Sequence, residues 1–238
     1  MLRALDRHAL REGLALVVQV DVGQLPAGLG DLPELPRLID EQDAGQGFPE
    51  VCCELPAVCG KVQESVDVAE DILAFGFRAV QLLRLLQRNV EGAHRAGLFC
   101  GAYHYSYALT PADAVAEARY CKWVIENSGV LLELPIFFDM EDGDGWKTYH
   151  GFDFSRRNVT AVCRAFLDEI QPLNAGVYAS LSWLEDLIDW RSLNCPIWNA
   201  QYYRQDFFKG YMWQYTDRLI IDGQQFDGNI LYDDTGKQ

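Results

Sequence analysis

Three carboxylates follow one short apolar segment near the middle of the chain. Asp139, Glu141 and Asp142 come directly after the segment 134–138. In an extended chain successive side chains alternate between two faces, so Asp139 and Glu141 point the same way. Like charges held close raise one another's pKa, so one acid can donate a proton while its neighbour stabilises positive charge. Such a pair suits glycosidase chemistry, but an isolated Asp-x-Glu pattern is more often a solvated acidic turn after a core strand or a cation loop.

The elements that must position these acids alternate between extended and helical patterns. A parallel sheet of βα units is the expected arrangement, and the class is α/β. In such folds functional residues collect at the carboxyl ends of the strands, where Asp139 and Glu141 lie. Strands are predicted over 14–22, 101–108, 134–140, 175–180, 196–202, 211–215 and 226–231, and helices over 89–96, 110–128 and 155–170.

Aromatic side chains accumulate in the predicted strands. Core packing is one interpretation of each ring, and contact with the apolar faces of sugars bound beside an acidic cleft is the other. His104 points to the face opposite its tyrosine neighbours, where a packed histidine is expected. The aromatic residues are Tyr103, Tyr105, Tyr107, Tyr178, Trp198, Tyr202, Trp213 and Tyr215.

Composition limits the classes of partner. The 238 residues suffice for one α/β domain, and the formal net charge of −15 argues against nucleic acid or an anionic membrane. No apolar run reaches the roughly eighteen residues that span a bilayer, and the amino-terminal residues do not predict a signal peptide. The seven cysteines include no Cys-x-x-Cys pair and have no histidine at ligand spacing. We therefore predict reduced thiols, with neither a zinc site nor a disulfide framework.

The chain changes character near residue 88. Residues 1–88 contain no Trp, no Tyr and three Phe, whereas residues 89–238 hold all six Trp, all eleven Tyr and nine Phe. We therefore predict two parts, an atypical segment over 1–88 and the main functional part over 89–238. No chemistry can be assigned to the first part from its own residues.

Six blocks of the second part resemble glycoside hydrolase family 25 lysozymes in type and order. They are distributed over most of the length of residues 89–238, which makes the match specific. The blocks are Gly101-Ala102-Tyr103-His104-Tyr105, Phe138-Asp139-Met140-Glu141-Asp142, Gly176-Val177-Tyr178-Ala179-Ser180, Trp198-Asn199-Ala200-Gln201-Tyr202, Met212-Trp213-Gln214-Tyr215 and Phe226-Asp227-Gly228-Asn229.

The resemblance implies an N-acetylmuramidase on a distorted (β/α) barrel. Such an enzyme cuts the β-1,4 bond between N-acetylmuramic acid and N-acetylglucosamine in the peptidoglycan of bacterial cell walls. Glu141 would be the general acid, Asp139 would stabilise charge on the sugar or its acetamido group, and Asp227 would be a further cleft carboxylate. The implied protein is a monomer that needs no metal or organic cofactor. The substrate-binding residues would be Tyr103, Tyr105, Tyr178, Trp198, Gln201 and Trp213.

The amino-terminal part departs from the family pattern. Family members begin with a strand of the type Gly-Ile-Asp-Val-Ser, and the nearest counterpart here is Val20-Asp21-Val22-Gly23. Asp21 is the candidate for the family's first aspartate. A barrel incomplete at its amino-terminal strands is one alternative, which would make the chain a non-catalytic glycan-binding remnant. Another is that residues 1–88 are misframed or poorly ordered, and the nucleotide sequence would show whether a shifted frame restores the expected strand.

Overall fold

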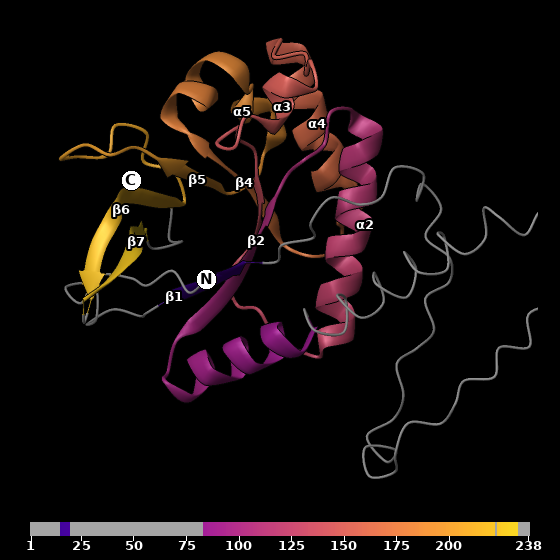
Figure 1. Cartoon of the computed structure of the whole chain (residues 1–238). Coiled ribbons are helices and arrows are strands. Elements are labelled where there is room, and N and C mark those ends of the chain that lie inside the picture. The colour runs from indigo at the N-terminus through magenta and orange to yellow at the C-terminus, as the bar shows by residue number, and fades with distance from the viewer. Residues whose placement is uncertain (1–14, 20–82, 222, 233–238) are drawn as a thin grey trace, which may run out of the picture. The chain divides into compact units, whose positions relative to one another are not determined.

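The computed structural model describes residues 15–19, 83–221 and 223–232 (Figure 1). Their strands form one sheet of seven, in which the order across the sheet is the order along the chain. The first six strands run parallel, and the last two pair antiparallel. The strands are β1 (Ala15–Gln19), β2 (Phe99–Tyr105), β3 (Ile136–Asp139), β4 (Ala175–Ser180), β5 (Ile197–Ala200), β6 (Met212–Ile221) and β7 (Gln224–Leu231).

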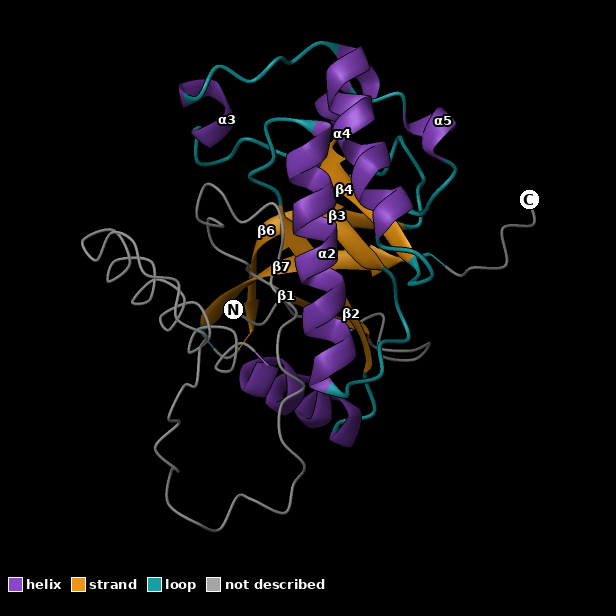
Figure 2. Cartoon of the chain, turned by 90° about the vertical axis from the view of Figure 1, so that its right-hand side faces the viewer, coloured by secondary structure: helices purple, strands orange, loops and turns teal. Residues whose placement is uncertain are grey.

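Two long helices cover one face of this sheet, as Figure 2 shows. They are α2 (Pro111–Ser128) and α4 (Arg156–Glu169), which pack against each other, and α4 also contacts β3 and β4. A helix over 83–95 lies at one end of the sheet, and short helices lie at the opposite end (Figure 1). The short elements are α3 (Trp146–Tyr149), the π-helical turn η3 (Trp183–Leu187) and α5 (Trp190–Leu193).

Local sequence signals account for the ends of the long helices. The Thr110 hydroxyl accepts a hydrogen bond from the Asp113 backbone N–H, while the Asp113 side chain accepts one from the Thr110 N–H, which forms a capping box. Ser155 caps α4 in the same way by accepting from the Asn158 N–H. Gly97 adopts a left-handed conformation, with φ of 74°, directly after the helix over 83–95. These signals explain why the helices predicted from sequence are present.

The two faces of the sheet carry different cores. On the concave side, a cluster of Tyr103, Phe137, Tyr178, Trp198 and Met212 is buried. Alternation along the strands sends the intervening residues to the helical side. There the rings of Phe138 and Phe166 stack at a centroid separation of 4.2 Å, and the ring of His104 lies beside them, at 6.3 Å from Phe138 and 5.6 Å from Phe166. His104 is thus the packed histidine that the sequence predicted.

The predicted fold class is confirmed as an α/β sheet consistent with an incomplete (β/α) barrel. Each of the six strands predicted after residue 89 is present, and a strand also forms within 14–22. Strand β6 extends past the predicted end at residue 215, because it forms a hairpin with β7. Among the described residues no ladder joins β1 to β7, so the sheet is open at these two edges. Asp21 lies outside the described residues.

None of the helices in the described part of the chain has the length and apolar character needed to cross a membrane. This agrees with the absence of a long apolar run in the sequence.

Gly176 has no side chain, which allows the neighbouring backbone and ring to lie close to β4. A Cβ on Gly176 of β4 would lie 2.3 Å from the Pro196 carbonyl oxygen and 2.9 Å from the Phe137 ring. We expect Gly176→Ala to lower the free energy of unfolding by about 1–3 kcal/mol, because overpacking must displace backbone or ring. Urea unfolding measures this. The control Gly92→Ala lies in the helix over 83–95, where nothing crowds a Cβ, and should raise stability by about 0.5–1 kcal/mol. Equal effects of both changes would contradict the packing argument.

Candidate active site

Asp139 lies at the last position of β3, in a row of side chains that crosses the sheet. The strand register pairs Tyr105 with Asp139, Asp139 with Tyr178, and Tyr178 with Trp198. Register partners in a parallel sheet share a face, so these four side chains lie on the concave side. Asp139 is 1% exposed. The strand end therefore places one carboxylate among three aromatic rings.

Glu141 follows two residues later, beyond the strand, and is only partly buried. A Cβ on Gly143 would lie 3.0 Å from Glu141 Oε2 and 3.9 Å from the Tyr105 hydroxyl oxygen. The carboxylate of Glu141 thus lies against a glycine and on the side of Tyr105. Burial, followed by the negative charges of Glu141 and Asp144, raises the pKa of Tyr105 above its ordinary value. Tyr105 consequently remains a neutral hydrogen-bond donor, and its hydroxyl donates to Asp144 Oδ1 at 3.2 Å.

The acidic segment after Glu141 is a turn that begins α3. The carboxylate of Asp142 accepts from the Lys147 N–H at 2.7 Å and from the Thr148 hydroxyl at 2.6 Å. Asp144 accepts from the Trp146 N–H at 3.0 Å. Both carboxylates therefore hold the turn in shape.

Lys147 is a buried cation behind the two candidate acids. Its ammonium group donates to the backbone carbonyl of Ser106 and, at 2.9 Å, to that of Glu141. Burial lowers the pKa of Lys147, while the negative charges of Glu117, Asp139, Asp142 and Asp144 act in the opposite direction. Lys147 thereby connects the segment after β2 to the segment after β3, and it places positive charge near Asp139.

Asp227 enters the site through a polar network on β6 and β7. Gln214 donates from Nε2 to Asp227 Oδ2 at 3.1 Å. Its Oε1 atom accepts from the hydroxyls of Tyr178 at 2.8 Å and Tyr202 at 2.9 Å. Since Tyr178 is the register partner of Asp139, Gln214 connects the strand row to Asp227. Gln214 is buried, so its hydrogen bonds fix the direction of the Asp227 carboxylate.

The other predicted substrate-binding residues occupy two different places. Tyr103 and Trp198 belong to the buried core cluster, and the Trp198 indole N–H donates to Asn229 Oδ1 at 3.0 Å. Trp213 donates its indole N–H to the backbone carbonyl of Gln201 at 2.7 Å, and Gln201 Oε1 accepts from the Phe207 N–H at 3.2 Å. Alternation along β5 and β6 puts Gln201 and Trp213 on the face opposite Trp198 and Gln214. The row thus contains Tyr105, Tyr178 and Trp198 but not Gln201 or Trp213.

Three residues of this arrangement were not singled out in the sequence. Gln214 and Asn229 belong to blocks that carry the family resemblance, so their position in those blocks was an available signal. Lys147 gave no signal, because nothing in its neighbours along the chain indicates burial beneath two strand ends. Asp21, the candidate first aspartate, lies outside the described residues.

Carboxylates at the strand ends of an α/β barrel, with aromatic rings beside them, are typical of glycoside hydrolases. The model of the glycosyl hydrolases family 25 matches residues 83–224, which is more than half of the chain, and the chain belongs to this family. No curated protein matches the sequence.

Solved structures agree on the fold. The modular autolysin LytC from Streptococcus pneumoniae matches with a TM-score of 0.54 and 22% identity, over 62% of this chain and 37% of that chain. The same autolysin in complex with a synthetic peptidoglycan ligand matches with a TM-score of 0.52 and 22% identity, over 60% of this chain and 36% of that chain. The CTP1L endolysin matches with a TM-score of 0.51 and 23% identity, over 61% of this chain and 51% of that chain. This chain therefore spans between about a third and a half of the length of these proteins.

The contacts of Lys147 predict a stability effect. Lys147→Met keeps the apolar stem but removes the charged donor to two carbonyls, so we expect a loss of about 1.5–3 kcal/mol in unfolding free energy. Urea unfolding followed by tryptophan fluorescence measures it. The control is Lys209→Met at an exposed position, which should change stability by less than about 0.5 kcal/mol. A Lys147 variant as stable as this control would show that the buried ammonium contributes nothing.

Proposed function

We propose that this chain hydrolyses the β-1,4 bond between N-acetylmuramic acid and N-acetylglucosamine in peptidoglycan. Membership of family 25 supports a glycoside hydrolase that acts on cell walls. The observation that carries the proposal is the position of Asp139 at the end of β3, between Tyr105 and Tyr178, with Glu141 just beyond it. That arrangement presents two carboxylates beside aromatic rings at the carboxyl end of the sheet, where barrel enzymes bind substrates.

Glu141 suits the role of general acid because its side chain is partly accessible. In this role it protonates the glycosidic oxygen as the bond to the leaving sugar breaks. Asp139 is nearly inaccessible and lies within the electrostatic influence of Lys147, so it suits the role of a fixed negative charge. That charge would stabilise the positive charge that develops on the sugar ring or on its acetamido group.

Asp227 is the third carboxylate of the proposed site. Gln214 holds it, and the same amide accepts from Tyr178 and Tyr202. Tyr202 is 55% exposed, so its ring can contact a sugar, while its hydroxyl stays bound to Gln214. Asp227 would then orient the acetamido group or the attacking water from the side of the β6–β7 hairpin.

The glycan would contact the accessible rings first. Tyr105 and Tyr202 are partly or largely exposed, whereas Tyr103, Tyr178 and Trp198 are buried and would support the floor of the site. Gln201 and Trp213 would shape the loop that carries Tyr202. The partner is a peptidoglycan glycan strand, bound by a monomer at the bacterial cell wall. This mechanism requires neither a metal ion nor an organic cofactor.

A glycan-binding protein without catalysis is the second candidate. The observation that favours it is the sheet edge, because no ladder among the described residues joins β1 to β7. A barrel that stays open leaves unpaired strand edges and can lose a catalytic group from its first strands. Such a chain would keep the aromatic and carboxylate surface and bind glycan without cutting it.

Replacement of the general acid distinguishes the two candidates. We expect Glu141→Gln to lower the rate of cell-wall lysis by about 10²- to 10⁴-fold, because the amide cannot donate a proton to the leaving oxygen. Clearing of a purified cell-wall suspension measures the rate, and co-sedimentation with the same walls measures binding. Glu185→Gln, an exposed position in η3, is the matched control and should keep full activity.

The unchanged protein sets the reference for both assays. Wall binding without lysis by the unchanged chain would favour the glycan-binding candidate. Lysis by the Glu141 variant at the rate of the Glu185 control would remove Glu141 from the mechanism. Retained binding by a Glu141 variant that no longer lyses walls would assign this residue to the chemical step.

A further inference from the structure

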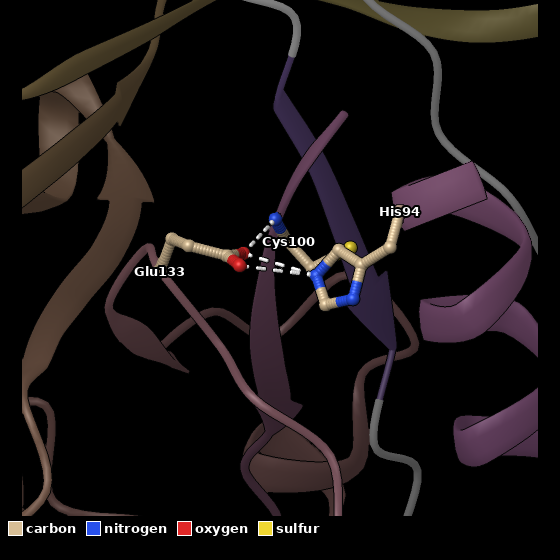
Figure 3. Close-up of side chains that lie close together, drawn as sticks. All are labelled: His94, Cys100 and Glu133. Atoms are coloured by element: carbon tan, nitrogen blue, oxygen red, sulfur yellow. Dashed lines mark hydrogen bonds and ion pairs between the residues drawn. The ribbon is translucent and has the colours of Figure 1, made fainter. Parts of the chain in front are cut away.

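Three potential metal ligands meet at the end of the sheet where β2 begins. His94 comes from the last turn of the helix over 83–95, Cys100 is the second residue of β2, and Glu133 precedes β3. One ligand atom from each lies within 4.8 Å of the other two. Figure 3 shows the imidazole and the carboxylate turned toward one another, with the Cys100 sulfur beside the ring.

Backbone contacts hold this group in place. The Gly97 N–H donates to the His94 carbonyl at 2.9 Å, which closes the turn between the helix and β2. The Cys100 N–H donates to Glu133 Oε2 at 2.9 Å, and the Leu134 N–H donates back to the Cys100 carbonyl at 2.9 Å. These two hydrogen bonds tie residues 133 and 134 to Cys100, which limits the relative motion of the carboxylate and the thiol.

We propose that His94, Cys100 and Glu133 bind a divalent, borderline-soft cation of the zinc type. Imidazole nitrogen, thiolate sulfur and carboxylate oxygen are the three donor classes that zinc accepts in proteins. A thiolate and a carboxylate together carry two negative charges, which neutralise the ion. The mixed donor set selects against magnesium and calcium, which prefer oxygen ligands alone.

The present geometry is near that of a loaded site. Ligands at about 2.0–2.3 Å from a tetrahedral ion lie roughly 3.3–3.8 Å from one another. His94 Nε2 lies 3.1 Å from Glu133 Oε1, slightly closer than two ligands of one ion, so a small separation of the two side chains would admit the ion. The Cys100 sulfur lies within 4.8 Å of both other ligand atoms, and it would exchange its hydrogen bond to the Val90 carbonyl for the ion. The side chains of His94 and Glu133 are 33% and 29% exposed, which gives an ion a path from solvent.

Binding must displace a proton from Cys100. Burial, and then the charge of Glu133, raises the pKa of this thiol to about 11, so it is protonated at neutral pH. The metal replaces that proton on sulfur, and the proton leaves to solvent. Three protein ligands leave a fourth tetrahedral position for water.

The location of the site predicts a stabilising role. A bound ion would connect the helix over 83–95 to β2 and to the segment before β3. The candidate catalytic acids lie at the other end of β3 and just beyond it. A ligand that binds only the folded chain raises its melting temperature. The inference does not depend on the proposed hydrolase activity, so either can fail alone.

Cobalt titration of the full, reduced chain tests the site. We expect one tightly bound Co²⁺ per chain, a thiolate-to-cobalt charge-transfer band, release of one thiol proton and displacement by Zn²⁺ but not by excess Mg²⁺. Zn²⁺ should also raise the melting temperature. Cys100→Ser should abolish the band, and His94→Gln should weaken binding by at least about tenfold, since even loss of an outer-shell partner has that effect.

Matched variants separate this site from the other thiols. Cys163→Ser removes a thiol buried elsewhere and should leave the band unchanged. The triple change Cys52→Ser, Cys53→Ser and Cys59→Ser should also preserve it. The proposal is overturned if the band persists in the Cys100 variant, if the triple change abolishes it, or if cobalt binds without a thiolate band. His94→Gln, at a partly exposed position, keeps the test valid if the buried Cys100 variant does not fold.

Discussion

The buried ammonium group of Lys147 is the interaction on which the candidate active site depends. It donates to the carbonyls of Ser106 and Glu141, which follow two adjacent strands, and so fixes the distance between those segments. A buried charge costs several kcal/mol to desolvate unless hydrogen bonds and opposite charges compensate it. Here two carbonyls and the surrounding carboxylates supply that compensation, Asp139 among them. Glu141 is therefore held through its own backbone carbonyl.

The β6–β7 hairpin contributes Gln214 and Asp227 to the candidate active site. Gln214 uses both ends of its amide, donating to Asp227 and accepting from two tyrosine hydroxyls. Because both ends of the buried Gln214 amide are hydrogen-bonded, its orientation is fixed. The amide therefore holds the Asp227 carboxylate in a fixed position relative to the sheet. Strand β7 runs antiparallel to β6, whereas β6 runs parallel to β5, so two consecutive strands present Gln214 and Asp227 on one face. Family membership and this shared polar network together support a glycosidase rather than an acidic turn of purely structural importance.

The two ends of the sheet have different chemistry. Carboxylates, aromatic rings and a buried lysine gather near its carboxyl end, where barrel enzymes place their substrates. At the amino end of β2, a thiol, an imidazole and a carboxylate meet instead. Both groups of residues arise because parallel strands align equivalent ends, so residues distant in sequence become neighbours. Glu133 and Cys100 are separated by 33 residues yet share a hydrogen bond.

Periodicity and end signals in the sequence determined the elements. The capping residues Thr110 and Ser155 act through bonds to residues three positions away, so α2 and α4 could be predicted from the sequence alone. Alternation along one strand predicted Asp139 and Glu141 on a common face, whereas the structure ends β3 at Asp139 and places Glu141 beyond the strand. Family blocks added Asp227, although no local pattern connects it to β3. The helix predictions succeed because each cap rests on contacts within a few residues.

Only the tertiary structure shows the burial of Lys147, the hydrogen bonds of Gln214 and the proximity of His94, Cys100 and Glu133. It also shows which aromatic residues pack in the core and which lie at the surface. Burial of Lys147 beneath two strand ends depends on segments about forty residues apart. Tyr103 and Tyr105 look equivalent in sequence, yet one packs in the core and the other reaches the turn that carries Asp144. The physical reason is that burial and long-range hydrogen bonds depend on the register and curl of the whole sheet, which no short stretch of sequence encodes.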